Sequence, residues 1–303
     1  MSTTSWTRVS GVMLAAALWA GGALAGEVRL VAKGQANCVI VAPAGWTNDA
    51  ALPEGLPKKA ASLMGERHTL YRESVKDLAL YLGKMSGTTI EIVEGLPKGE
   101  KRIPIYIGTE AQKVFGNVGI SKAGLFGFRV VVNAKRGVGL YGESEVGTSY
   151  AIYELLHRLG CRWFMPTELG EVVPERPTLM VAEMDEKLAP ATEARSMSQG
   201  GAEYMRRNRM GFHGNTVWLA EGDGSFQRFF SAEEIKAHPD WSHEGYLRLV
   251  HPGVAEHNAN KMLAELEKVY EPLRKAGLRP GYSIVPSDGQ APSLEQLQQW
   301  CAL

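Results

Sequence analysis

Short β-like runs alternate with two amphipathic stretches of helical spacing, and this order restricts the first half of the chain to a mixed α/β fold. The helical stretches are residues 72–85 and 148–159, and each is followed by a glycine of the kind that ends helices. The β-like runs, each closed by Gly, Pro or Asn, cover residues 38–42, 89–93, 103–107, 128–132 and 137–141. We therefore predict an N-terminal α+β sandwich domain, in which helices cover a small sheet.

The pattern changes after this first part. Residues 185–190 are polar and end in a proline, which is typical of a linker, so we place a domain boundary there. Beyond it, strand-like and helix-like segments alternate, as in a β/α barrel or a doubly wound sheet. A complete (β/α)8 barrel takes about 250 residues. We expect residues 26–188 to form the first domain and residues 189–303 to form an incomplete, truncated barrel.

The N-terminus has the three parts of a secretory signal. Arg8 precedes an apolar run at residues 12–24, and Ala23-Leu24-Ala25 fits the small-residue cleavage pattern. We predict a signal peptide at residues 1–25, a mature chain that begins at Gly26, and a secreted or periplasmic location. The apolar run is shorter than the roughly 20 residues of a membrane span, so no membrane contact is expected after cleavage. An uncleaved anchor is the alternative.

Charge and cysteine content exclude several classes of protein. The chain has 33 Lys and Arg residues against 33 Asp and Glu residues and contains no basic block, so a nucleic-acid partner is not expected. The cysteines Cys38, Cys161 and Cys301 are far apart and include no C-x-x-C element. This spacing argues against a disulfide framework and against a structural zinc site.

Two motifs bear on cofactors and metals, and the residue types argue against both. Residues 142–147 have the spacing of a phosphate-binding loop, but Thr148 stands where such a loop has lysine. Glu143 and Glu145 would repel phosphate, so we interpret the segment as a structural turn. Four histidines fall within residues 238–257 without the H-E-x-x-H spacing. We expect no cofactor and no metal.

Several motifs of the first domain occur in the order of one known accessory domain. They cover residues 103–109, 137–142, 147–156, 159–166 and 170–174. Together they resemble the N-terminal α+β domain that precedes the catalytic barrel in family 67 α-glucuronidases, in family 20 hexosaminidases and in a poorly characterised bacterial group. The resemblance covers about residues 36–183 and implies a domain of that fold here.

The second part of the chain resembles the opening of the barrel in the same bacterial group. The residues that carry this similarity are 207–210, 238–241, 249–254 and 283–289. Members of the group look like glycoside hydrolases that act on polysaccharides, so the resemblance implies a carbohydrate substrate. Fold analogy of this kind sets an expectation and does not establish an activity.

Glycoside hydrolysis usually needs two carboxyl groups that flank the scissile bond. Asp288 follows the strand-like run 281–286, and Glu221 follows the run 215–220, so both lie where barrels place catalytic groups. We predict Asp288 and Glu221 as candidate catalytic residues, with a solvated loop acid as the alternative for each. The His-x-Gly-Gly-Asp-Glu signature of family 20 is absent, so the hexosaminidase mechanism is not carried over.

Aromatic and histidine side chains supply the candidate sugar contacts. Trp241 lies beside a polar segment and is predicted to offer a flat face to a pyranose ring. His213 and His238 are predicted to bind sugar hydroxyls by hydrogen bonds. Trp163 and Phe164 directly follow a helix stop, and we predict both as core residues.

These observations favour an exported, glycoside-hydrolase-like protein that acts on or binds an oligo- or polysaccharide. Because only about three barrel strands can be identified, we expect this chain to have little or no glycosidase activity. The alternatives are a non-catalytic carbohydrate-binding module and a protein-interaction module.

Overall fold

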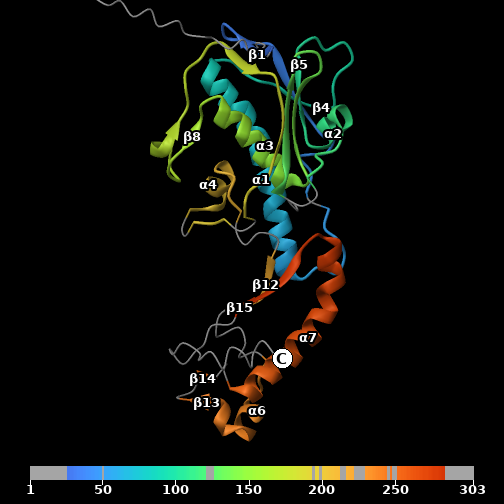
Figure 1. Ribbon diagram of the computed structural model, residues 1–303, viewed down its shortest axis with the longest axis vertical. Helices are drawn as coiled ribbons and strands as arrows, with labels where there is room; N and C mark the ends of the chain where they lie inside the picture. The colour runs from blue at the N-terminus through green and yellow to red at the C-terminus, as the bar shows by residue number, and fades with distance from the viewer. Residues whose placement is uncertain are drawn as a thin grey trace, which may run out of the picture.

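The computed structural model of the protein consists of an N-terminal sheet-and-helix unit and a smaller second unit next to it (Figure 1). The structure describes residues 26–49, 51–120, 126–192, 195–197, 200–211, 216–221, 229–243, 246–247 and 251–283. The predicted signal peptide at residues 1–25 lies outside this range.

A six-stranded mixed sheet is the centre of the first unit. Its strand order is β11-β6-β7-β5-β3-β4. Neighbouring strands are parallel from β7 to β4, whereas β6 and β11 run antiparallel to their neighbours. The strands are β3 (Cys38–Ala42), β4 (Ile92–Glu94), β5 (Ile103–Ile107), β6 (Phe128–Asn133), β7 (Gly137–Gly142) and β11 (Met184–Leu188).

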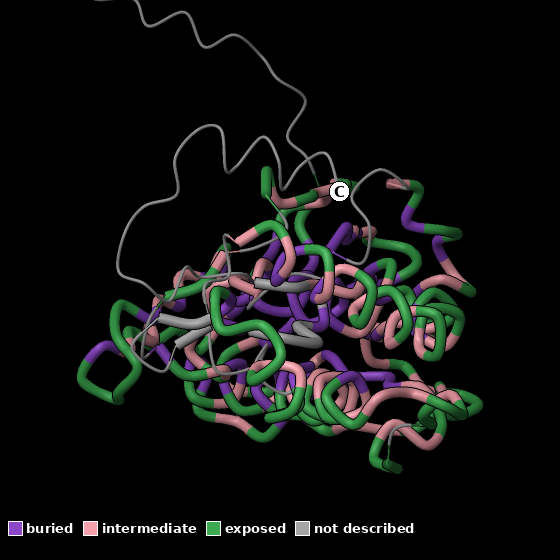
Figure 2. The backbone as a smooth tube through the Cα atoms, turned by 90° about the horizontal axis from the view of Figure 1, so that it is seen from below, coloured by how far each residue is buried: buried purple, intermediate pink, exposed green. Residues whose placement is uncertain are grey.

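Helices cover both faces of this sheet. Helices α1 (Lys58–Ser86) and α3 (Glu145–Arg158) pack on one face, where the main hydrophobic core lies, and α2 (Thr109–Phe115) packs on the other (Figure 1). Side chains alternate between the faces along β6, because Val130 and Val132 join the main core while Val131 packs with Phe115 of α2. Figure 2 shows the buried residues at the centre, between layers of exposed backbone.

Two smaller sheets complete the first unit. One has the order β10-β1-β2, formed by β1 (Glu27–Ala32), β2 (Gln35–Ala36) and β10 (Leu179–Ala182). The other is a hairpin of β8 (Arg162–Trp163) and β9 (Glu171–Val172), with a short 3-10 helix, η2 (Glu168–Gly170), between the strands. The hairpin projects from the unit beside α1 and α3 (Figure 1).

Helix α4 (Ala202–Arg207) packs against α1 and α3 of the first unit and precedes the second unit in the chain. Strands β12 (Thr216–Glu221) and β15 (Arg279–Ser283) pair in parallel, and α7 (Pro252–Lys275) connects back to β15, which forms a β/α crossover. The remaining elements are α6 (Ala232–Ala237), η3 (Pro239–Trp241), β13 (Ser242–His243) and β14 (Tyr246–Leu247). The described part of the chain is mixed α/β, as predicted, and does not show a barrel.

Helix α1 contacts both units. Its C-terminal half packs in the main core through residues such as Leu78 and Leu82. Its first turns pack elsewhere, where Ala60 lies in a separate cluster with Val217 of β12 and Leu273 of α7. A single helix therefore links the two hydrophobic clusters (Figure 1).

The structure corrects three expectations from the sequence. Residues 185–188, expected in a linker, belong to edge strand β11, where Arg129 of β6 donates two hydrogen bonds of 2.7 Å to Asp185. The strand expected at residues 193–197 is reduced, among the described residues, to one isolated bridge at Arg195. Phe164, expected in the core, is 69% exposed, whereas its neighbour Trp163 is buried, as predicted.

The glycine-rich segment forms the tight turn between β7 and α3. A Cβ on Gly142 would lie 2.3–2.5 Å from backbone atoms of Gly147 and Thr148, so this close approach requires glycine. The Ser144 side chain caps α3 by accepting a hydrogen bond from the Gly147 amide at 3.2 Å. Cys38 and Cys161, the two cysteines within the described residues, are buried and free.

Candidate functional site

The residues predicted as site residues lie mostly in the second unit. Asp288 and His213 fall outside the described residues. Glu221 is the last residue of β12, where its backbone pairs in register with Ser283 of β15. Glu221 therefore lies at the carboxyl end of a strand that pairs in parallel. Its catalytic role stays a prediction.

Trp241 and His238 are brought together by the structure. Their rings stack with centroids 4.0 Å apart and an interplanar angle of 8°. His238 is exposed, but Trp241 is only 8% exposed and packs in a small core with Phe230 and Val254. Trp241 therefore has a packing role, and sugar binding by this pair stays a prediction.

A polar cleft lies in the first unit, between α1, the β8–β9 hairpin and α4. Its volume is about 680 Å³, within the range of small-molecule sites. Aromatic, acidic and basic side chains share its walls. The residues that line it are Leu80, Tyr81, Lys84, Trp163, Met165, Pro166, Thr167, Glu168, Glu171, Gly200, Gly201, Ala202, Glu203, Tyr204 and Arg207.

A hydrogen-bond chain runs along one wall of the cleft. Trp163 donates from Nε1 to the Tyr81 hydroxyl at 3.1 Å, and Tyr81 donates in turn to Glu171 at 2.5 Å. Lys84 donates to the other oxygen of Glu171 at 2.7 Å. Burial acts to raise the pKa of Glu171, but the hydrogen bonds from Lys84 and Tyr81 outweigh it, and the net pKa is lowered. Glu171 is therefore ionised and fully paired.

A second set of polar contacts lies under the cleft, around Asp77 of α1. Asp77 accepts a hydrogen bond from the Tyr153 hydroxyl at 2.8 Å and two from Arg207, at 3.0 and 3.3 Å. Arg207 also pairs with Glu203 at 2.7 Å. Burial acts to lower the pKa of Arg207, but the hydrogen bond and charge of Asp77 raise it above its usual value. This ion pair attaches α4 to α1.

Three buried aromatic rings pack beneath these charges. Tyr81 and Tyr153 both meet Trp163 edge-on, with centroids 5.1 and 5.6 Å apart. The Arg207 guanidinium lies 5.5 Å from the Tyr81 ring and 6.0 Å from the Trp163 ring, within reach of cation–π attraction. Of the aromatic side chains that line the cleft, Tyr204 is half-buried, so the cleft offers a ligand one partly exposed ring beside its charged groups.

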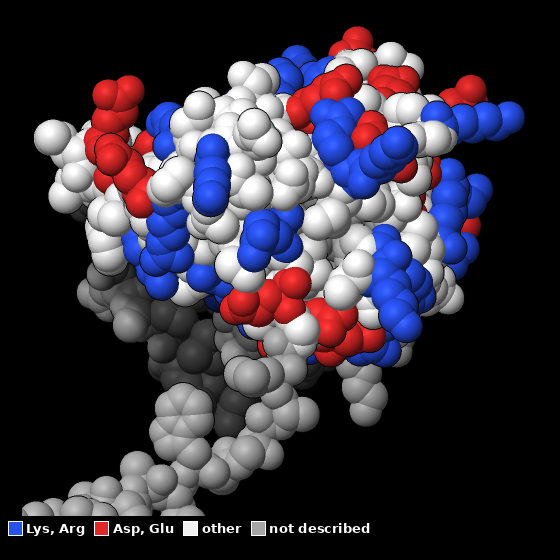
Figure 3. Space-filling model, turned by 90° about the horizontal axis from the view of Figure 1, so that it is seen from above, with Lys and Arg blue, Asp and Glu red and all other residues white. Residues whose placement is uncertain are grey.

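No family model and no curated protein matches this chain. Among the described residues, no helix is both long and apolar enough to cross a bilayer. Within the same residues, no group of His, Cys, Asp and Glu side chains is arranged to hold a metal ion. On the face shown in Figure 3, basic and acidic side chains lie interspersed, in line with the balanced charge of the sequence.

Two of the first-domain motifs that carried the resemblance, at residues 159–166 and 170–174, contribute to the cleft. Residues 162–166 and 170–174 form the hairpin wall, and the segment that begins at Arg207 supplies the ion pair with Asp77. The sequence did not identify Asp77 or Tyr81 as site residues. One sequence feature could have pointed to them. Asp77 lies directly beside the apolar positions of the predicted helix, and Tyr81 follows four residues later on the same face.

A second cavity lies at the carboxyl ends of the parallel strands β3, β5 and β7. It measures about 450 Å³ and is lined by the turns that follow these strands and by His68 of α1. His68 contacts Glu145 through Nδ1 at 2.7 Å and the Asn48 carbonyl through Nε2 at 2.8 Å. Both ring nitrogens are thus held by the protein, so His68 ties the β3–α1 loop to the start of α3.

Proposed function

We propose that this protein is an exported carbohydrate-binding protein of glycoside-hydrolase-like architecture, and that the cleft between α1, the β8–β9 hairpin and α4 binds the sugar. The observation that carries the proposal is the half-buried Tyr204 ring, which lies on the wall of the same cleft as the charged side chains of Lys84, Glu171 and Arg207. Pyranose rings have apolar faces and hydroxyl edges, which match an aromatic ring set among polar side chains.

Binding fits this cleft better than hydrolysis does. A glycosidase acid must hold a proton at working pH, which requires a raised pKa. Glu171 has a lowered pKa and is paired with Lys84 and Tyr81, so it is not suited to donate a proton. Asp288 and Glu221 remain the proposed catalytic carboxyl groups of the second unit, with Trp241, His213 and His238 as proposed sugar contacts.

Tyr204→Ala is the variant that tests the cleft. Tyr204 is half-buried on its wall and donates a hydrogen bond to the Phe164 carbonyl at 3.2 Å. We expect loss of the ring to weaken oligosaccharide binding by about tenfold or more in isothermal titration calorimetry, since aromatic contacts dominate such sites. Tyr204→Phe keeps the ring and should bind nearly as wild type.

The matched control is Tyr270→Ala, because Tyr270 is a tyrosine 51% exposed on α7 and outside the cleft. It should leave binding unchanged. The proposal is wrong if the wild-type chain binds no oligosaccharide in a panel of neutral and acidic glycans. Turnover of aryl glycosides that is abolished by Asp288→Asn would place hydrolysis in the second unit instead.

Export is tested separately by the mass of the secreted protein. If residues 1–25 are removed as proposed, mass spectrometry of protein collected outside the cytoplasm should give an N-terminus at Gly26. A product that still begins at Met1 would contradict cleavage and favour the uncleaved anchor.

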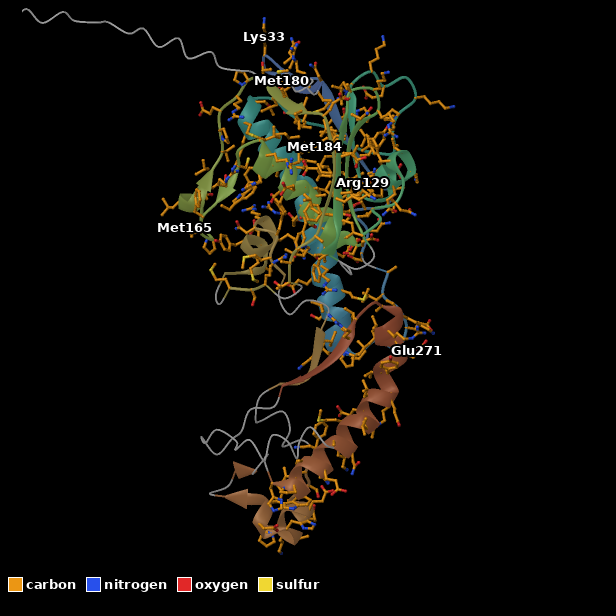
Figure 4. All side chains as sticks on the ribbon, in the orientation of Figure 1. Lys33, Arg129, Met165, Met180, Met184 and Glu271 are labelled. Carbon is orange, nitrogen blue, oxygen red and sulfur yellow. The ribbon has the colours of Figure 1, made fainter. Side chains whose placement is uncertain are left out.

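A protein-interaction role is the second candidate, and one observation favours it. Apolar side chains on and beside the hairpin are exposed: Leu169 is 92% exposed, Phe164 is 69% exposed and Met165, labelled in Figure 4, is 49% exposed. Exposed apolar groups that cluster in this way mark contact surfaces. Phe164→Ser should then prevent a pull-down that Tyr204→Ala leaves intact, which separates the two functions.

A further inference from the structure

Helix α4 has a second arginine that faces away from the cleft. Successive residues on a helix point about 100° apart, so Arg206 and its neighbour Arg207 face different sides. Arg207 binds Asp77, whereas Arg206 lines a separate cavity of about 330 Å³ between α1, α3 and α4. Of the described lining residues, the cavity and the cleft share only Ala202.

Arg206 is buried without full pairing. The residue is only 6% exposed, and the Nη1 atom of its side chain has no hydrogen-bond partner within the described structure. A buried guanidinium nitrogen almost always has an acceptor, because its desolvation is costly. The missing acceptor can be supplied by a ligand in the cavity that Arg206 lines.

A second cation lies in the same cavity. Arg67 of α1 lines it, and burial together with the charge of Arg206 lowers the pKa of Arg67 to about 10. Burial likewise lowers the pKa of Arg206, and the nearby Tyr150, Tyr153, Glu66 and Glu145 oppose this effect without offsetting it. Of these, Glu66 is exposed at the cavity. Two guanidinium groups therefore lie at the wall of this cavity, and only the Arg206 group is deeply buried.

The remaining wall of the cavity is apolar. Beside Ala202 and Gly211, it contains the larger side chains of Leu63, Leu70, Phe126, Val146, Met205 and Met210. A bare inorganic ion would leave most of this wall uncovered, and the volume is large enough for a small organic molecule. The wall and the two guanidinium groups together select a ligand with one anionic head and an apolar body.

We propose that this cavity binds a small molecule that carries a carboxylate on an apolar body, with the carboxylate paired to Arg206 and Arg67. Arginine forms two parallel hydrogen bonds to a carboxylate, and these bonds strengthen when they are shielded from water. The apolar body lies against Phe126 and the methionines, which suit ligands of varied shape. This site does not depend on sugar binding in the cleft.

Calorimetry of the full chain with three probes tests the proposal. We expect 3-phenylpropionate to bind saturably with one site per chain, and 3-phenylpropanol and sodium sulfate to bind at least about tenfold more weakly. Equal binding of the alcohol would overturn the role of the arginines. Equal binding of sulfate would overturn the role of the apolar wall, and absence of saturable 3-phenylpropionate binding at millimolar concentration would overturn the site.

Variants locate the binding in this cavity. Arg67→Gln and Arg206→Gln should each weaken 3-phenylpropionate binding at least about tenfold. Arg72→Gln is the matched control, because Arg72 is on the same helix and donates to the Thr47 carbonyl outside the cavity. If Arg206→Gln fails to fold, Arg67→Gln decides alone, since Arg67 is less buried. Unchanged binding by Arg67→Gln would contradict the proposal.

Discussion

Replacing Trp163 by alanine is expected to lower the free energy of unfolding by about 3–5 kcal/mol, the range for large aromatic side chains removed from a core. Trp163 is 6% exposed and meets Tyr81 and Tyr153 edge-on. Its Nε1 donor also holds the Tyr81 hydroxyl, which in turn binds Glu171. Urea denaturation followed by fluorescence and circular dichroism measures the change, and the melting temperature should fall by roughly 10 °C.

Phe164→Ala is the matched control for this variant. Phe164 is the adjacent aromatic residue but is 69% exposed, so its removal should change stability by no more than about 0.5 kcal/mol. Similar losses for the two variants would mean that the hairpin buries both rings. A Trp163→Ala protein of unchanged stability that no longer binds sugar would assign Trp163 to ligand contact.

Asp77→Ala should have the second large effect, about 3 kcal/mol of lost stability. The change leaves the Arg207 guanidinium and the buried Tyr153 hydroxyl without their shared acceptor. Breaking a buried ion pair from one side costs about 3–5 kcal/mol, and the low end applies because the Arg207 side chain is 19% exposed. Thermal and urea unfolding both report this loss.

Two further variants isolate the charge of Asp77. Asp77→Asn keeps the size and one acceptor oxygen, so it should lose less stability than Asp77→Ala. Glu73→Ala is the surface control one turn earlier on α1, where Glu73 pairs with exposed Lys76 at 2.9 Å, and it should have little effect. Equal stability of Asp77→Ala and Glu73→Ala would show that the Arg207 pair does not attach α4.

The sheet could be predicted from the sequence because its strands carry strong local signals. The run 38–42 is apolar at every position and became β3, which is buried throughout. Residues 103–107, 128–132 and 137–141 likewise fall within β5, β6 and β7. Strand β11 was missed because an edge strand needs few apolar residues: its side chains are exposed or half-buried, and one of them pairs with Arg129.

Long-range contacts account for what the sequence did not predict. Helix α1 begins at Lys58, well before the amphipathic stretch, because Ala60 packs against residues more than 150 positions away in the chain. The cleft has the same origin: Arg207 binds Asp77 across 130 positions, and Tyr81 binds Glu171 across 90. No local pattern encodes such pairings. The motifs could therefore be recognised in the sequence, but the cleft could not be predicted from them.

The length of α1 limits how this protein can vary. At 29 residues the helix spans about 43 Å, and each residue rotates the next by about 100°. A one-residue insertion in its middle would turn Ala60 away from Val217 and Leu273 while Leu78 stayed in place. Only insertions of about seven residues, two full turns, would keep both ends of the helix facing their clusters. Even such an insertion would move the two clusters about 10 Å further apart.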